Sequence, residues 1–101
     1  MPFARIVTVR ATPGKVGELI ATTRSDVEKE TPPRGLLSLY ALHDMQDPDA
    51  GLLVSFFETR EALEANTVNL QADFAALQAL LAAPPTMAVY QVVFERPAST
   101  E

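Results

Sequence analysis

The sequence predicts an α+β domain in which an antiparallel four-stranded sheet carries its helices on one face. Stretches rich in β-branched and aromatic residues alternate with stretches of helical periodicity, in the order strand, helix, strand, strand, helix, strand. Segments containing proline or glycine separate them, as is typical of connections. This order is the split β-α-β, or ferredoxin-like βαββαβ, arrangement. With 101 residues the chain has room for one hydrophobic core.

The first strand and helix are predicted from a change of periodicity near residue 12. A run of β-branched residues predicts the strand over residues 3–11. Thr12 is the expected N-cap of the helix, with Pro13 at the first helical position, where its missing N–H costs nothing. The segment 31–35 contains two prolines and ends the helix. The apolar stripe of this helix consists of Val16, Leu19, Ile20, Thr23 and Val27.

The centre of the chain is predicted to be a hairpin from Leu36 to Glu58. Its turn, over residues 44–51, is rich in Asp, Pro and Gly. Side chains alternate across a strand, yet both faces of each arm are apolar and need cover. The predicted helices can cover only one face, and soluble monomers rarely leave such a large apolar patch open. We therefore expect a two-fold homodimer whose two sheets close over a shared interior.

The second helical region is predicted in two pieces. Thr59 can cap a short helix over residues 60–65, and residues 66–69 read as a break. A longer helix over residues 70–83 follows, with leucine and phenylalanine on one face and several alanines elsewhere. The second helix is therefore expected to be broken in two.

The C-terminal part is predicted to complete the sheet and then fray. A last strand is expected over residues 86–96, again with apolar residues on both faces. A single domain therefore spans residues 1–96, and residues 97–101 are expected to form a disordered tail.

Charge and composition exclude several classes of partner. The net charge of −5 and the scattered basic residues argue against nucleic acid, whose binding depends on clustered Lys and Arg. The absence of Cys excludes a disulfide framework and a thiolate metal site. Arg5 and Arg10 interrupt the N-terminal apolar stretch, unlike a signal peptide. No apolar run has the length of a membrane span, so we expect no membrane association and a cytoplasmic location.

Short segments along the chain resemble one known family in their order and spacing. They are Pro13-Gly14-Lys15, Tyr40-Ala41-Leu42-His43 leading to Asp47-Pro48, Phe57-Glu58-Thr59 followed by Glu61-Ala62-Leu63-Glu64-Ala65-Asn66, and Phe74-Ala75-Ala76-Leu77. Over almost its whole length the chain resembles the antibiotic biosynthesis monooxygenase (ABM) domain family of the dimeric α+β barrel superfamily. The resemblance implies a dimeric α+β barrel that oxidises a small phenolic or quinol substrate with O₂, using no cofactor and no metal.

The chain also departs from the family pattern. Phe57 stands where the family usually has Trp, and the chain contains no Trp. Asn66 stands where the family often has His. Relatives that degrade haem depend on such residues, so the departures weigh most against haem degradation.

The resemblance implies a set of site residues. His43, the only histidine, is a candidate catalytic base because imidazole exchanges a proton near neutral pH; alternatively it is a solvent-facing strand end. Asn66 is the second candidate catalytic residue, able to hydrogen-bond a substrate oxygen or simply to end a helix. The expected substrate-binding residues are Val7, Val9, Tyr40, Ser55, Phe57 and Phe74.

Three polar groups in apolar strands have two interpretations each. Arg5 must reach water or an acceptor, which could be a ligand anion or an acid of the other subunit. Ser55 can bond the backbone or a ligand. Tyr40 can bind the substrate or be a core residue with its hydroxyl at an edge.

Two other functional classes stay open beside the monooxygenase. One is a non-catalytic dimeric α+β barrel protein that binds a small apolar ligand. The other is a purely oligomerising interaction domain, whose second sheet face serves only to associate. Measurements of ligand binding and of oxygen uptake distinguish these three functional classes.

Overall fold

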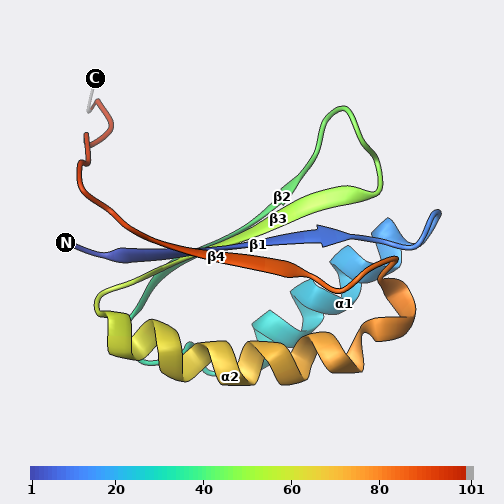
Figure 1. Cartoon of the computed structure of the whole chain (residues 1–101), viewed down its shortest axis with the longest axis horizontal. Helices are drawn as coiled ribbons and strands as arrows, with labels where there is room; N and C mark the ends of the chain where they lie inside the picture. The colour runs from blue at the N-terminus through green and yellow to red at the C-terminus, as the bar shows by residue number, and fades with distance from the viewer. Residues whose placement is uncertain (100–101) are drawn as a thin grey trace.

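The computed structural model describes residues 1–99 and has the predicted order of elements (Figure 1). The ferredoxin-like α+β fold is thereby confirmed. The elements are β1 (Phe3–Arg10), α1 (Val16–Lys29), β2 (Leu36–His43), β3 (Ala50–Phe57), α2 (Arg60–Ala76), the 3₁₀ turn η1 (Gln78–Leu80) and β4 (Thr86–Gln91).

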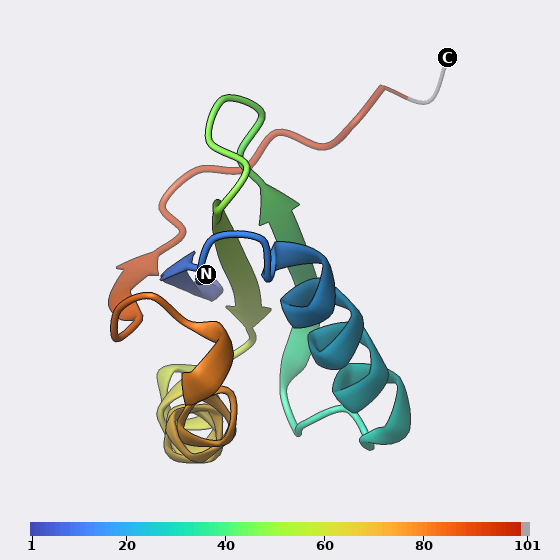
Figure 2. The same ribbon diagram turned by 90° about the vertical axis from the view of Figure 1, so that its right-hand side faces the viewer.

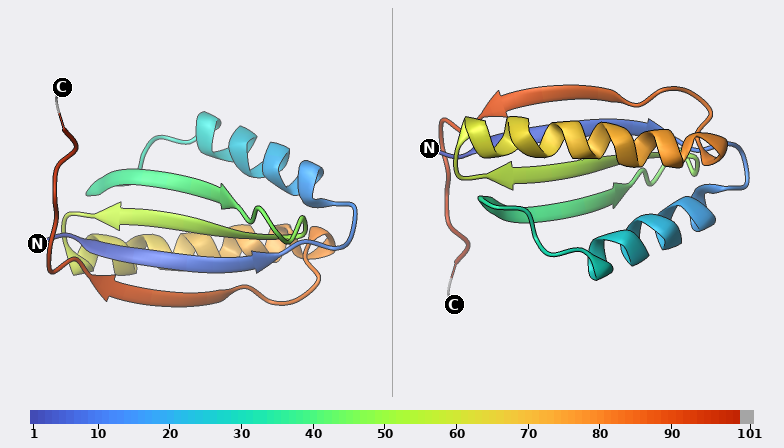
Figure 3. Two further views of the ribbon diagram at one scale, coloured as in Figure 1. Left: turned by 90° about the horizontal axis from the view of Figure 1, so that it is seen from above. Right: turned by 90° about the horizontal axis from the view of Figure 1, so that it is seen from below.

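The four strands form one antiparallel sheet in the order β2-β3-β1-β4. Both helices lie on the same side of this sheet (Figure 2). Helix α2 runs beneath the central strands, whereas α1 lies toward the β2 edge (Figure 3). In the part of the chain that the structure describes, no helix combines the length and apolar composition needed to cross a bilayer.

Strand register decides which side chains meet the helices. Arg5 of β1 lies opposite Ser55 of β3, and Val7 lies opposite Leu53. Because side chains alternate across a strand, these four share the helix-bearing face. Val7, Leu63 of α2 and Phe57 of β3 are almost inaccessible to solvent, so the core lies between the central strands and α2.

The opposite side of the sheet, called here the open face, carries no helix and no further strand within residues 1–99. Tyr40 and Tyr90 at its two edges are 54% and 55% exposed. The segment after β4 turns toward this side of the sheet, away from the helices (Figure 1), and its Val93 and Phe94 are more than three-quarters exposed. The open face consists of Ala4, Ile6, Thr8, Ser38, Tyr40, Leu42, Leu52, Val54, Phe56, Ala88 and Tyr90.

The prediction that Thr12 caps α1 is wrong. The helix begins at Val16, and Lys15 is its N-cap without a side-chain cap bond. Thr12 instead accepts a backbone hydrogen bond from Lys15 (2.9 Å), and Gly14 has φ +81°. Pro followed by a glycine with positive φ is typical of a type II turn, so Pro13 and Gly14 form a turn before the helix.

The predicted break at residues 66–69 is also wrong, because α2 is one helix up to Ala76. Asn and Thr normally weaken helices when their side chains compete for backbone groups. Here the Asn66 side chain is bonded to Arg5, and the Thr67 hydroxyl donates to the Leu63 carbonyl one turn back. Tertiary contacts therefore override the local preference. The change of geometry comes later, at Leu77, where α2 ends and η1 follows.

Strand β4 is shorter than predicted and ends at Gln91 rather than residue 96. Within residues 1–99 its only neighbouring strand is β1, which begins at Phe3. The last bond of this edge runs from the Val92 N–H to the Pro2 carbonyl (2.9 Å), and beyond it β1 offers no further partner. The tail predicted for residues 97–101 lies partly outside the described residues, since 100 and 101 are not described.

Gly35 provides a test of how the α1–β2 connection packs against α2. It has φ +82°, and an added Cβ would lie 2.7 Å from the Ala62 Cβ. Gly35→Ala should lower the free energy of unfolding by about 3 kcal/mol, from backbone strain and overpacking together. Gly14→Ala is the matched control, because φ is +81° there but the space is open. Urea unfolding should show a loss of about 1 kcal/mol for the control; equal losses would contradict the proposed packing.

Candidate functional site

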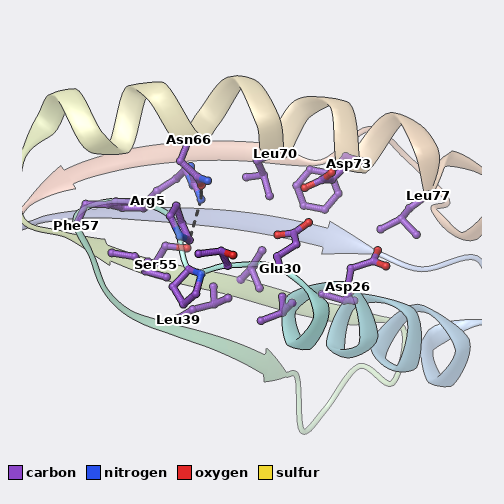
Figure 4. Close-up of a pocket in the computed structure, with 18 residues that line it drawn as sticks. Arg5, Asp26, Glu30, Leu39, Ser55, Phe57, Asn66, Leu70, Asp73 and Leu77 are labelled. Carbon is purple, nitrogen blue, oxygen red and sulfur yellow. Dashed lines mark hydrogen bonds between the residues drawn. The ribbon is translucent and has the colours of Figure 1, made fainter.

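A cleft lies between α1 and α2 on the helix-bearing face of the sheet (Figure 4). It consists of two cavities of about 180 and about 490 Å³. Arg5 lines the smaller cavity and His43 the larger, and we call these the Arg5 end and the His43 end. The two cavities meet at shared lining residues: Thr23, Val27, Leu39, Leu53 and Phe74.

The walls at the Arg5 end are apolar. This is the usual composition of a small-molecule pocket, in which a few polar groups fix orientation. Three exposed carboxylates lie around the opening: those of Asp26 in α1, Glu30 directly after α1, and Asp73 in α2 (Figure 4). The apolar lining is formed by Leu36, Leu39, Leu53, Phe57, Leu70, Phe74 and Leu77.

Arg5 is the centre of a hydrogen-bonded cluster that joins β1 to β3 and α2. Its Nη1 donates to Thr67 Oγ1 (3.0 Å) and its Nη2 to Asn66 Oδ1 (2.8 Å). Nη2 also makes a longer contact with Ser55 Oγ (3.4 Å), and the guanidinium carbon lies 5.3 Å from the centre of the Phe57 ring. The charge is thus held by neutral oxygens and an aromatic ring.

The Arg5 guanidinium is buried without a counter-charge. The residue is 2% exposed, and no carboxylate of residues 1–99 lies within ion-pair distance of it. Its Nε–H is buried and has no hydrogen-bond partner among the described residues. Desolvation by burial lowers the pKa of Arg5, although a guanidinium remains charged at neutral pH.

Asn66 has its side-chain orientation fixed by Arg5. A guanidinium can only donate, so the amide oxygen must face Arg5, and the Nδ2 group must then point away from it. Asn66 lines the cleft, and its Nδ2 makes no hydrogen bond with a described residue. The amide therefore offers its two N–H groups as donors at the Arg5 end.

His43 lies at the other end of the cleft. It is exposed, and its Nε2 is 2.8 Å from the Pro48 carbonyl oxygen in the hairpin connection. Leu39 is the β2 residue opposite Ser55, four positions before His43. At the rise of a strand this separation is about 13 Å. The two residues predicted to be catalytic, His43 and Asn66, are therefore not brought together.

The predicted substrate-binding residues divide between four places. Ser55, Phe57 and Phe74 line the Arg5 end, and Val9 lines the His43 end. Val7 is buried between them on the same face, 1% exposed. Tyr40 belongs to the open face, where its ring meets Phe56 edge-on at 6.5 Å, so it does not reach the cleft.

Sequence reasoning missed Thr67 and the acidic opening. Thr67 lay in the predicted helix break. In a continuous helix, residues four positions apart lie on the same face, so Thr67 lies next to Leu63, one turn earlier. The carboxylates of Asp26, Glu30 and Asp73 looked like ordinary solvated helix faces. Arg5 and Ser55 did give a sequence signal, as polar groups inside apolar strands. Among residues 1–99, no three Asp, Glu or His side chains are grouped so that they could hold a metal ion.

The sequence profile of the antibiotic biosynthesis monooxygenase family matches residues 2–69, about two-thirds of the chain. The chain belongs to this family. The match runs from β1 into α2, so it includes Arg5, Ser55, Phe57 and Asn66 of the ABM domain. Domains of this family are typically dimeric.

Solved structures have the same fold as this ABM domain. A protein from Chloroflexus aurantiacus J-10-fl, described as a "putative Antibiotic biosynthesis monooxygenase", is 27% identical with a TM-score of 0.74, over 96% of this chain and 98% of its own. A protein of unknown function from Nitrosomonas europaea is 22% identical with a TM-score of 0.77, over 97% and 96%. A conserved protein from Methanosarcina mazei Go1 is 14% identical with a TM-score of 0.78, over 90% and 92%.

The comparison with functionally curated proteins gave no match. The family profile and the solved structures together show the family and the fold of the ABM domain.

The bond between Asn66 and Arg5 should contribute to stability. Asn66→Ala removes the shortest acceptor of a buried cation, which should cost about 1–3 kcal/mol in the free energy of unfolding. Asn69→Ala is the control, because Asn69 is exposed on the same helix and the gain in helix propensity is the same. Urea unfolding should show Asn66→Ala to be the less stable variant; equal stabilities would mean that the bond contributes nothing.

Proposed function

We propose that this ABM domain is a cofactor-independent monooxygenase that oxidises a small phenol or quinol with O₂ in the cleft between α1 and α2. Family membership supports the proposal. The observation that carries it is an apolar cleft with hydrogen-bond donors gathered at one end, from Arg5, Ser55 and Asn66. Such a cleft suits a flat ring with an oxygen at one edge.

The reaction asks the protein to bind its substrate as the phenolate, with the phenolic proton given up to solvent on binding, and to orient the ring. An electron-rich phenolate reduces O₂ by itself, and for a phenol with a free ring position the balance is phenol plus O₂ giving quinone plus water. One oxygen atom enters the ring, and the second takes two hydrogens from the substrate. The apolar walls exclude water, while Asn66 and Ser55 hold the ring oxygen in one orientation.

Oxygen uptake tests the activity directly. A panel of quinols and phenols is mixed with the protein without oxygen, air is admitted, and O₂ and hydrogen peroxide are followed. A monooxygenase should consume one O₂ per quinone without releasing peroxide. Asn66→Ala should lower the rate of oxygen uptake by about a hundredfold, as expected when a donor to a developing oxyanion is lost. Asn69→Ala should keep the wild-type rate.

Other outcomes identify the competing hypotheses. A loss of activity in His43→Ala as large as that in Asn66→Ala would move the chemistry to the His43 end of the cleft. Binding of a ligand without oxygen uptake by any member of the panel would contradict the enzyme and favour a non-catalytic binding protein.

We also propose that the protein is a homodimer joined through the open face. Large apolar side chains of the open face, including Val54 and Phe56 at its centre, are only partly covered in the single chain. The segment after β4, whose Val93 and Phe94 are exposed, turns to the same side, where a second copy would cover it. The cytoplasmic location expected from the sequence remains part of this proposal.

Tyr40→Asp tests the dimer. A carboxylate at this exposed position should leave the single chain folded but would be buried between two sheets, so sedimentation at micromolar concentration should show monomers. Val68→Asp is the matched control, because Val68 is also exposed (67%) but lies on α2. A dimer that persists in Tyr40→Asp, or a wild-type monomer, would contradict the open face as the interface.

A further inference from the structure

We propose that the Arg5 end of the cleft is an oxyanion site, and that it takes an aromatic ligand as its phenolate or carboxylate. This inference deepens the proposed function, on which it rests, because the oxyanion would be that of the substrate. The chemistry common to both ligand types is a flat apolar ring that carries one negatively charged oxygen group.

The first argument is the unbalanced charge of Arg5. The ion pairs of residues 1–99 are Arg10–Asp47, Lys15–Glu18 and Arg60–Glu64, and all six side chains are substantially exposed. Arg5 differs from these basic residues in being both buried and without an acid. An isolated buried charge is costly unless it is paired, and groups of this kind cluster at functional sites.

The second argument concerns the source of the missing anion. Arg5 faces α2, on the side of the sheet opposite the open face. A second copy bound to the open face would be separated from Arg5 by the sheet itself. The sequence offered two possible acceptors for Arg5, a ligand anion and an acid of the other subunit. An acid of the other subunit does not reach the guanidinium through this interface. The cleft, which Arg5 lines, is the remaining route.

The third argument is that several donors converge at this point. The Ser55 contact with Nη2 is long (3.4 Å), so both groups can turn to a ligand at small cost. Asn66 presents its Nδ2 group, because Arg5 occupies its oxygen. The Nε–H of Arg5 also has no acceptor among the described residues. A cationic donor, an amide and a hydroxyl together match a negatively charged oxygen.

The acidic opening limits how much negative charge the ligand can carry. Asp26, Glu30 and Asp73 line the same cleft and are exposed. Their field reaches about 8 Å at physiological ionic strength, which is the scale of a two-ring ligand. A second anionic group at the outer edge of the ring would meet like charges there. The site should therefore prefer a monoanion with a neutral outer edge.

Binding of a matched set of naphthalene compounds tests the proposal. Naphthalene-2-carboxylate, naphthalene-2-carboxamide and naphthalene-2,6-dicarboxylate share one ring system and do not need O₂, so affinity is measured by calorimetry at pH 7. The monocarboxylate should bind at least about tenfold more tightly than the amide, as expected for hydrogen bonds to a charged group. It should also bind more tightly than the dicarboxylate.

Variants of two arginines in β1 test whether Arg5 causes the preference for the carboxylate. Arg5→Met should remove the preference for the carboxylate while the amide still binds, and Arg5→Lys should keep part of it. Arg10→Met is the matched control, because Arg10 is an exposed β1 arginine on the other face, paired with Asp47. The control should keep the full preference. The ratio measured on the wild-type protein tests the site even if Arg5→Met does not fold.

A phenol distinguishes the two kinds of oxyanion. The ionisation of 2-naphthol is followed by its absorbance, free and in the presence of saturating protein. A pKa of the bound naphthol below that of the free compound, in the wild type but not in Arg5→Met, identifies the phenolate as the bound form. A carboxylate preference with an unchanged naphthol pKa identifies the carboxylate. Equal affinity for carboxylate and amide, together with an unchanged naphthol pKa, would overturn the proposal.

These results separate the oxyanion site from the proposed reaction. A carboxylate or phenolate preference without oxygen uptake would support the site and contradict the monooxygenase. Oxygen uptake without either preference would support the monooxygenase and overturn the oxyanion site.

Discussion

The buried guanidinium of Arg5 is the interaction on which the arrangement of the helix-bearing face depends. Its hydrogen bonds join three elements, because Ser55 belongs to β3 and Asn66 and Thr67 to α2. They also explain why α2 stays helical where Asn and Thr would favour a break. The cluster fixes the distance between α2 and the sheet at one end, and the cleft opens beyond it.

Burial of the Arg5 guanidinium costs stability, and it places a positive charge inside an otherwise apolar cleft. An apolar residue at position 5 would fill the same place without the cost of desolvation, and would be neutral or favourable in many cores. The neutral oxygens and the Phe57 ring reduce that cost but do not cancel the charge. A binding site commonly has this character, since the ligand supplies the interaction that the free protein lacks.

The fold was predictable because its signals are local and repeated. Several local signals predict the same fold: strand and helix periodicity, the prolines of the α1–β2 connection, and the Thr59 cap. The cap is present, because Thr59 accepts a hydrogen bond from the Ala62 N–H. The site was less predictable because it depends on pairing between distant residues. Both faces of β2 are apolar, so the sequence could not tell that Tyr40 points away from the cleft. The bond between Arg5 and Asn66 spans 61 positions and leaves no periodic trace.

In strand β1 the side chain of Arg5 points to the cleft, and that of the next residue, Ile6, points to the open face. A slip of one position in pairing would exchange them, placing the charge on the open face and a hydrocarbon where the donors converge. Insertions and deletions should therefore be rare in the β1 segment of natural variants. The hairpin connection at residues 44–49, which lies beyond the paired strands, should tolerate changes of length better.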